Sequence, residues 1–277
     1  MLCKLIFEVI IMKVREIMSL LDSIAPFANQ AEWDNSGLIV GDMNADVKKI
    51  VVSLDATDEV VEQAIQAKAD LLITHHPLVF APVLKVNSEN FITNRMLKLA
   101  QNKVNYIAMH TNIDKTALAD VADELLNINK ERAIEVDINS EDKKLGFGSI
   151  GKFMNANKEL VNITLRDAVI RTKNAFQREV VNVYGDLDTV VTKVAVCTGS
   201  GKSMIEECIK EKCDLLITGD ITYHAALDAL AQGLSIIDAS HFGTEIVFAD
   251  LVITFLEYNL TDVKLIRGMQ SEIGMFM

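Results

Sequence analysis

The five histidines of this chain are the residues best suited to chemistry, and they are not scattered. Each follows a short apolar run: His75 and His76 come after LLIT, His110 after YIAM, His224 a turn after a second LLIT, and His241 after LSIID. A lone histidine is usually a hydrogen-bonded structural residue. Five of them at the ends of predicted strands instead favour a metal or catalytic site.

Carboxylates accompany these histidines. Glu245 follows His241 at i+4, so the two meet on one face of a helix that starts near Gly243. Neighbouring side chains diverge from an extended backbone, so His75 and His76 suit two metal ions better than one. The predicted ligands are His75, His76, Asp114, His241 and Glu245. Three imidazoles and two carboxylates suit two divalent transition-metal ions (Zn, Mn, Fe, Co or Ni) and are too rich in nitrogen for Ca or Mg.

Two such ions, about 3.5 to 4 Å apart, would hold a bridging water and lower its pKa. Metal-bound hydroxide would then attack a carbonyl, phosphoryl or amidine carbon, so the predicted reaction is hydrolysis. His110, Asp220 and His224 are the candidate catalytic residues, which would orient ligands or move protons. Plain structural hydrogen bonding is the alternative role for these three residues.

An internal repeat supplies the elements that would position these residues. Residues 49–74 align without a gap on residues 193–218, with ten identities in 26 positions. Each copy reads as a buried strand, a helix with an apolar face and a second strand, LLIT, which is a βαβ unit with parallel pairing. A third apolar strand follows each copy, at 104–109 and 234–237. In such sheets the functional crevice lies beyond the carboxyl ends of the strands, where the histidines fall.

The predicted fold is therefore α/β, with two pseudo-symmetric lobes. We divide the chain into an N-terminal extension (1–11), a first lobe (12–128) and a second lobe (129–277) that includes a connecting region (130–190). Within the connecting region we expect a helix at 164–176 and a strand at 180–184. A further amphipathic helix is predicted at 244–258, as a core or subunit-contact helix.

Composition limits the classes of function. Half of the residues are hydrophobic, which is enough for a large packed core. The net charge of −12 is the wrong sign for binding nucleic acid or an anionic membrane surface. The longest apolar stretches, 2–12 and 246–256, are interrupted by charges and too short to span a membrane. Four cysteines without a C-x-x-C spacing fit reduced core thiols in a cytoplasmic protein.

Seven short motifs, in order, cover nearly the whole chain from Met12 to Glu245 and beyond. They are WDNSGL (33–38), SLDAT (53–57), THHP (74–77), HTNID (110–114), GSGKS (199–203), TGD (218–220) and HFGTE (241–245). Together they resemble the Nif-three-like dinuclear-metal-centre proteins, which are often named type-two GTP cyclohydrolase I homologues. The chain departs from that family in its extension before Met12, and it is too short between its halves for the extra domain of longer relatives.

The resemblance implies a two-metal centre between two α/β lobes and a homohexameric toroid whose metal sites face an internal cavity. It carries the metal-ligand role onto the same five residues, all present without substitution. A small-molecule substrate is implied, with GTP-cyclohydrolase-like action on a nucleotide as one form of it. The rival hypothesis is a non-catalytic, metal-stabilised toroid that binds a partner protein.

Two further motifs have more than one interpretation. The loop 198–203 lacks the first glycine of a P-loop, because Val196 stands there, so it is either an accessory anion contact or a tight turn from strand to helix. Trp33, the single tryptophan, either walls a pocket near the metals, with its Asp and Asn neighbours as hydrogen-bonding groups, or packs over a structural turn.

Overall fold

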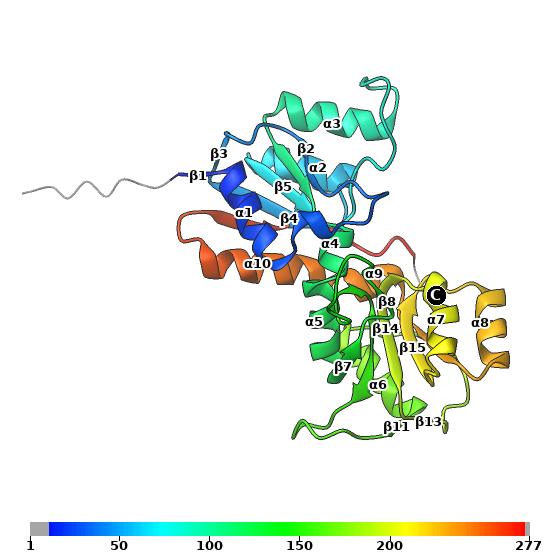
Figure 1. The fold of residues 1–277 in the computed structure, drawn as a ribbon. Coiled ribbons are helices and arrows are strands. Elements are labelled where there is room, and N and C mark those ends of the chain that lie inside the picture. Colours follow the sequence, from blue (N-terminus) through cyan, green and yellow to red (C-terminus); the bar gives the residue numbers. More distant parts are fainter. Residues whose placement is uncertain (1–10, 275–277) are drawn as a thin grey trace, which may run out of the picture. The chain divides into compact units, whose positions relative to one another are not determined.

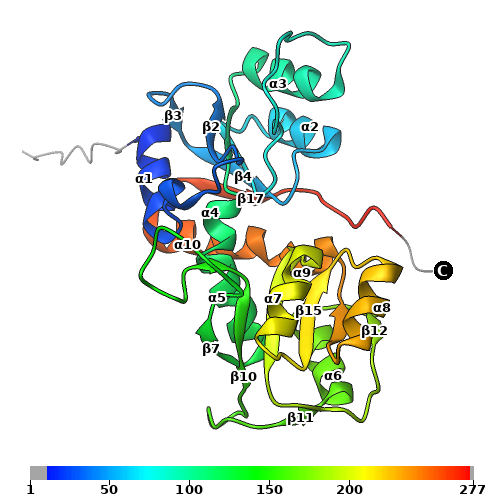
Figure 2. The same cartoon turned by 45° about the vertical axis from the view of Figure 1, so that its right-hand side comes forward.

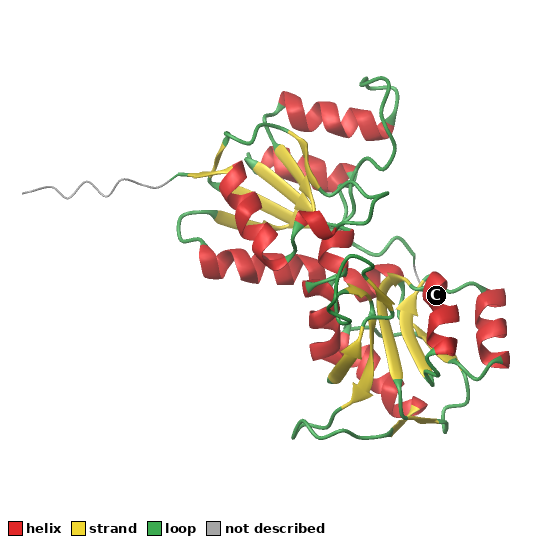
Figure 3. Cartoon of the chain, in the orientation of Figure 1, coloured by secondary structure: helices red, strands yellow, loops and turns green. Residues whose placement is uncertain are grey.

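Residues 11–274 are described by the computed structural model, and the chain divides into two compact units (Figure 1). The first unit runs to His110 and takes up the chain again at Val252–Gln270, and the second comprises Thr111–Leu251 and the residues from Ser271. Each unit is a sheet with helices packed against it (Figure 3), which confirms the α/β class. Apart from Ile11, the predicted N-terminal extension lies outside the described residues.

The first unit is built on a five-stranded sheet in the order β17-β4-β5-β6-β2. Its strands are β2 (Gly37–Val40), β4 (Lys49–Ser53), β5 (Leu71–Thr74), β6 (Asn105–Ala108) and β17 (Lys264–Arg267). The pairs β17/β4, β4/β5 and β5/β6 are parallel, and β2 is antiparallel at the edge. A separate antiparallel pair joins β1 (Met12–Lys13) to β3 (Asp46–Val47). The carboxyl ends of β5 and β6 therefore lie at the same edge of the sheet.

Helices cover both faces of this sheet. They are α1 (Val14–Ile24), α2 (Asp58–Gln66) and α3 (Phe91–Gln101), with a 3₁₀ turn at Phe27–Asn29. Val51, Leu72 and Tyr106 project from adjacent strands into a core shared with α2 and α3. Figure 2 shows α2 and α3 on one side of the strands and α1 on the other.

The second unit is built on a six-stranded sheet in the order β12-β16-β15-β14-β10-β7. Its strands are β7 (Ile128–Arg132), β10 (Ser149–Phe153), β12 (Asn182–Tyr184), β14 (Val194–Ser200), β15 (Leu215–Gly219) and β16 (Ser235–Asp238). The central pairs β14/β15 and β15/β16 are parallel, and the outer pairs are antiparallel. Two short pairs, β8 (Glu135–Val136) with β9 (Gly146–Phe147) and β11 (Ile163–Thr164) with β13 (Val190–Val191), lie outside it.

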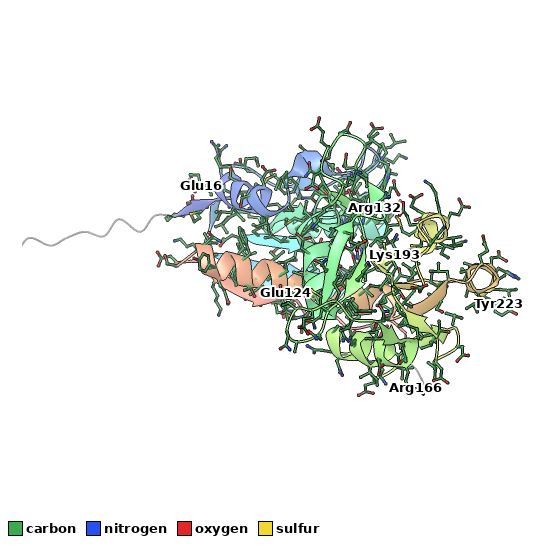
Figure 4. All side chains as sticks on the ribbon, turned by 60° about the horizontal axis from the view of Figure 1, so that its bottom comes forward. Glu16, Glu124, Arg132, Arg166, Lys193 and Tyr223 are labelled. Carbon is green, nitrogen blue, oxygen red and sulfur yellow. The ribbon has the colours of Figure 1, made fainter. Side chains whose placement is uncertain are left out.

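Side chains that alternate along these strands serve two different cores. Ala195, Leu216 and Ile236 pack with α7 (Ile205–Lys210) and α8 (Tyr223–Ala231). The intervening residues of the same strands pack with α5 (Ala117–Leu126) and α6 (Leu165–Ala175). The remaining helices are α4 (Thr111–Asp114), α9 (His241–Glu245), α10 (Val247–Asn259) and a 3₁₀ turn at Lys202–Met204. At one side of the sheet, Arg132 and Lys193, labelled in Figure 4, both pair with Glu211.

Two features of the structure add detail to the sequence-based picture. Residues 130–190, predicted as connecting structure within the second lobe, supply β10 and β12 of its sheet, and β7 begins just before them at Ile128. The chain returns to the first unit within α10, at Val252, and β17 then pairs in parallel with β4. The predicted helix at 164–176 is present as α6, and the predicted helix at 244–258 is split into α9 and α10. Within residues 11–274, no helix has both the length and the apolar character needed to cross a membrane.

Candidate metal centre

Three histidines gather at one sheet edge of the first unit. His75 and His76 follow β5, and His110 follows β6, so the parallel pairing of these strands brings the three side chains together. One ring nitrogen from each lies within 4.8 Å of the others. Imidazole nitrogens this close are arranged as metal ligands can be.

A bend, rather than an extended segment, carries His75 and His76. Their backbone N–H groups both donate to the carbonyl oxygen of Leu54, at 3.1 Å each. Their rings consequently lie near one another, with centroids 4.8 Å apart. The two imidazole planes are tilted by 49° to each other, and the argument that His75 and His76 suit two different ions stays a prediction.

The Nδ1 atom of each of these histidines has a hydrogen-bond partner. His75 Nδ1 lies 2.8 Å from the carbonyl oxygen of Met109, His76 Nδ1 lies 2.8 Å from Asp55 Oδ1, and His110 Nδ1 lies 2.8 Å from Asp34 Oδ1. Because a carbonyl or carboxylate oxygen accepts, each Nδ1 carries the proton, and Nε2 is the nitrogen that could ligate a metal. Carboxylate partners of this kind orient metal-bound histidines and raise their basicity.

The WDNSGL loop supplies one of these partners and is itself held in place. The Asp34 side chain is completely buried, and the Ser36 hydroxyl donates to Asp34 Oδ2 and accepts from the His110 N–H. Sequence reasoning placed a hydrogen-bonding clamp at this loop without assigning Asp34 to His110, and it gave Asp55 no role. The signal for Asp55 was its position, since it follows β4 at the edge where the histidines lie.

A histidine and a glutamate meet in the second unit, on α9. His241 Nε2 lies 2.9 Å from Glu245 Oε2, so the predicted i,i+4 contact is present, although the helix begins at His241 instead of near Gly243. Ser240 starts the helix by accepting a hydrogen bond from the N–H of Gly243. Asp220, which follows β15, accepts from His241 Nδ1 at 2.8 Å. His241 thus has the same carboxylate support as His76 and His110.

Gly199 of β14 faces this pair, because a Cβ at this position would contact both Glu245 Oε1 and His241 Nε2. Cys197, two residues earlier on β14, is buried, and its pKa is raised to about 12 by burial and by the negative charges of Asp114 and Glu245. The thiol is therefore neutral at physiological pH, unlike a cysteine ligand. Asp114 ends α4. Its carboxylate and that of Glu245 both raise the pKa of the Cys197 thiol.

His224 is not gathered with these residues. It lies exposed in the first turn of α8, with its ring 5.3 Å from that of Tyr223, which Figure 4 shows on the outer side of the helix. Among the described residues it joins no group of possible metal ligands. Of the three predicted catalytic residues, His110 lies beside His75 and His76 in the first unit and Asp220 pairs with His241 in the second, whereas His224 lies apart from both groups.

The glycine-rich loop 198–203 and Trp33 can also be placed. The loop joins β14 to a 3₁₀ turn and the six-residue helix α7, and its Gly199 and Gly201 lie against Glu245 and Thr218. These close contacts favour the tight-turn interpretation. The indole of Trp33 is 64% exposed and packs edge-on against His110, which favours a pocket wall over a residue packed on a turn.

Comparison with known proteins identifies the family. The model of the family described as Duf34/NIF3 (NGG1p interacting factor 3) matches residues 12–272. A Helicobacter pylori protein named GTP cyclohydrolase 1 type 2 is 35% identical over 246 residues, which cover 88% of this chain and 91% of the relative. A Clostridium acetobutylicum protein named GTP cyclohydrolase 1 type 2 homolog is 32% identical over 236 residues, which cover 84% of this chain and 85% of that protein.

A solved structure shows the same fold. The crystal structure described as the Bacillus cereus protein related to NIF3 superimposes with a TM-score of 0.84 at 21% identity, covering 96% of this chain and all of the other. The family model spans nearly the whole sequence, and both relatives exceed 30% identity over most of their lengths. This chain belongs to the Duf34/NIF3 family.

Proposed function

We propose that this protein is a di-metal-dependent hydrolase of a small molecule. The observation that carries the proposal is the shared support of four histidines, since each of His75, His76, His110 and His241 has its Nδ1 hydrogen-bonded to a carboxylate or carbonyl oxygen. Metal-ligating histidines almost always donate their other ring N–H to such a partner, and of these four histidines His75, His76 and His241 are the proposed ligands.

The metal ligands in this proposal are His75, His76, Asp114, His241 and Glu245. Their chemistry fits divalent transition metals, because imidazole and carboxylate are the ligands of Zn, Mn, Fe, Co and Ni sites. The fit is also geometric in the second unit. The 2.9 Å between His241 Nε2 and Glu245 Oε2 is a spacing that two ligand atoms of one ion adopt, and Gly199 leaves room for both.

Bound ions would lower the pKa of a water held between them and polarise the bond under attack. The residues of the chain have separate tasks. Asp55 and Asp220 orient His76 and His241. His110 lies beside His75 and His76 with its proton on Nδ1, so it is placed to accept or return a proton through Nε2.

The names of the relatives support a nucleotide as the substrate, with a cyclohydrolase-like opening of a ring amidine by water. Such a reaction uses the same chemistry as amide hydrolysis, because water adds to a carbon that is bonded to nitrogen. We also propose, from the family resemblance, that the protein acts as a cytoplasmic homohexamer. Light scattering of the purified protein tests the assembly.

Metal content and hydrolysis together test the function. Protein loaded with Zn, Mn, Fe, Co or Ni is dialysed, analysed for metal per chain, and assayed on phosphoester, amide and cyclic-amidine substrates, GTP included. We expect about two ions per chain, and loss of metal and turnover in His76→Ala and Glu245→Gln. Glu257→Gln, at an exposed position of α10, is the matched control and should behave as the wild type. Metal retained without turnover on any substrate would instead favour a non-catalytic, metal-stabilised assembly.

A further inference from the structure

Two large aromatic side chains stand exposed beside the histidines of the first unit. Trp33 is 64% exposed and Phe80 is 54% exposed. Both rings pack against the imidazole of His110, with centroid separations of 6.0 Å for Trp33 and 5.6 Å for Phe80. Bulky apolar groups left in water next to a cluster of possible ligands are typical of a binding surface, because the ligand covers them when it binds.

The two segments that carry these rings are connected to each other. The side-chain N–H of Asn35 donates to the carbonyl oxygen of Val79 at 2.8 Å, which ties the residues after Trp33 to the residue before Phe80. Ser36 is held from two sides, since its N–H donates to Gln30 Oε1 and its hydroxyl accepts from the His110 N–H. The exposed rings are therefore mounted on a hydrogen-bonded frame that also fixes His110.

The orientation of the rings indicates the shape of the ligand. The indole makes an angle of 74° with the imidazole of His110, and the Phe80 ring makes an angle of 78° with it. A flat ring stacked on either aromatic face would therefore meet His110 in the T-shaped geometry that aromatic quadrupoles favour. Stacking on an indole or a phenyl ring accepts flat rings with different substituents, because it requires only that the ligand have a π-face.

We propose that Trp33 and Phe80 are specificity-determining residues that bind a planar aromatic heterocycle of the substrate and hold it against His110. This inference rests on the proposed function in one respect. It assumes that the bond broken by hydrolysis lies on the side of the substrate heterocycle that faces His75 and His76. The chemical class is a flat nitrogen heterocycle such as a purine or a pterin. Contacts to sugar or phosphate are no part of the recognition by these two residues.

Binding is measured by the fluorescence of Trp33, which reports only this site because it is the single tryptophan of the chain. Guanosine monophosphate, adenosine monophosphate and pterin are the heterocyclic probes, and ribose 5-phosphate is the probe that lacks a ring. Titrations of the full chain are made with chelator and again with Zn²⁺, with correction for probe absorption. We expect saturable quenching at micromolar to millimolar concentration by at least one heterocycle, and none by ribose 5-phosphate.

Phe80→Ala should weaken this binding about 5- to 100-fold, as the loss of one stacking partner does. Phe91→Ala is the matched control, because Phe91 lies in the same unit and is 61% exposed but packs near Arg95 rather than His110. It should bind as the wild type does. For Trp33→Ala, which removes the reporter, binding is measured by equilibrium dialysis with the same probes and should weaken by a similar factor.

The outcomes separate this inference from the proposed hydrolysis. Ring-dependent quenching that Phe80→Ala weakens and Phe91→Ala does not would support the inference even if no substrate were hydrolysed. Absence of saturable quenching by every heterocycle at millimolar concentration would overturn it, as would equal effects of the two phenylalanine variants. Hydrolysis of a substrate without a ring, at a rate unchanged in Phe80→Ala, would retain the proposed function and reject the aromatic site.

Discussion

Gly199 lies against the carboxylate of Glu245, so closely that a Cβ at this glycine would stand 2.1 Å from Glu245 Oε1 and 3.4 Å from His241 Nε2. The backbone of Gly199 also has a φ of +68°, which residues with a side chain adopt only at a cost. The glycine therefore has two functions, the turn after β14 and the space for the two ligand side chains.

Gly199→Ala should displace the Glu245 carboxylate and weaken metal binding about 10- to 100-fold, the range seen when the support of a metal ligand is disturbed. Gly233→Ala is the control for backbone strain, because Gly233 has a φ of +87° and open space where its Cβ would lie. Both variants should lose about 1 to 2 kcal/mol of stability through backbone strain, and Gly199→Ala should lose more because its Cβ meets the buried Glu245 carboxylate. Metal retained after dialysis is the measurement, and equal retention in the two variants would remove Glu245 from the ligand set.

The carboxylates that support histidines should matter for metal affinity without being ligands. Asp55→Ala removes the partner of His76 Nδ1, and Asp220→Ala removes the partner of His241 Nδ1. We expect roughly tenfold weaker metal binding in each, because an unsupported imidazole is less basic and less well oriented. Competition titration with a chromophoric chelator measures this affinity. Asp262→Ala, at an exposed position before β17, is the control, and a loss of the same size there would count against an orienting role.

Tyr106 positions the turn that carries the first two histidines. Its buried hydroxyl accepts from the N–H of Leu78 at 2.9 Å, lies 2.8 Å from Thr74 Oγ1, and donates to the carbonyl oxygen of His76 at 3.0 Å. Burial raises the pKa of Tyr106 above its ordinary value, so the hydroxyl keeps its proton at neutral pH.

Tyr106→Phe should lower the free energy of unfolding by about 1 to 3 kcal/mol, because the buried N–H of Leu78 loses its acceptor. Chemical denaturation followed by circular dichroism measures the change. Tyr258→Phe is the matched control, since Tyr258 is 91% exposed, and it should leave the midpoint unchanged. Should both variants unfold at the wild-type midpoint, the Tyr106 hydroxyl does not hold the turn.

Asp123 of α5 should make stability depend on pH. Burial raises its pKa from 3.8 to about 6, against the opposing hydrogen bond that the Ser149 hydroxyl donates to it at 2.6 Å. The folded state therefore binds the proton more tightly than the unfolded state. This contribution to stability is complete below about pH 4 and is lost as the pH rises through about 6.

Asp123→Asn should remove this dependence. Between pH 4 and pH 7.5, the free energy of unfolding of the variant should rise relative to that of the wild type by up to about 3 kcal/mol. A shift of one pKa unit corresponds to about 1.4 kcal/mol. Denaturant midpoints at the two pH values give the difference. Asp120→Asn is the control. Asp120 lies on the same helix and pairs with Lys130, but its side chain is largely exposed, so this variant should keep the pH dependence of the wild type. A pH dependence that survives in Asp123→Asn would assign it to another group.

Local patterns predicted most of the secondary structure well. The two LLIT runs form β5 and β15, and the helix expected at 164–176 is α6. These predictions succeeded because strand and helix periodicity are local properties of the chain. The return of β17 to pair with β4 could not be predicted in the same way, because more than 200 residues separate the two strands and a four-residue run carries no mark of its partner.

The sequence by itself determined which chemistry is available. It placed every histidine after a strand, it put Glu245 four residues after His241, and its motifs identified the family. Only the tertiary structure decided how these side chains are held. The pairings of His110 with Asp34 and of His76 with Asp55 join residues 76 and 21 positions apart. Such hydrogen bonds depend on loop conformation and strand register, which packing of the whole unit sets and no local pattern records.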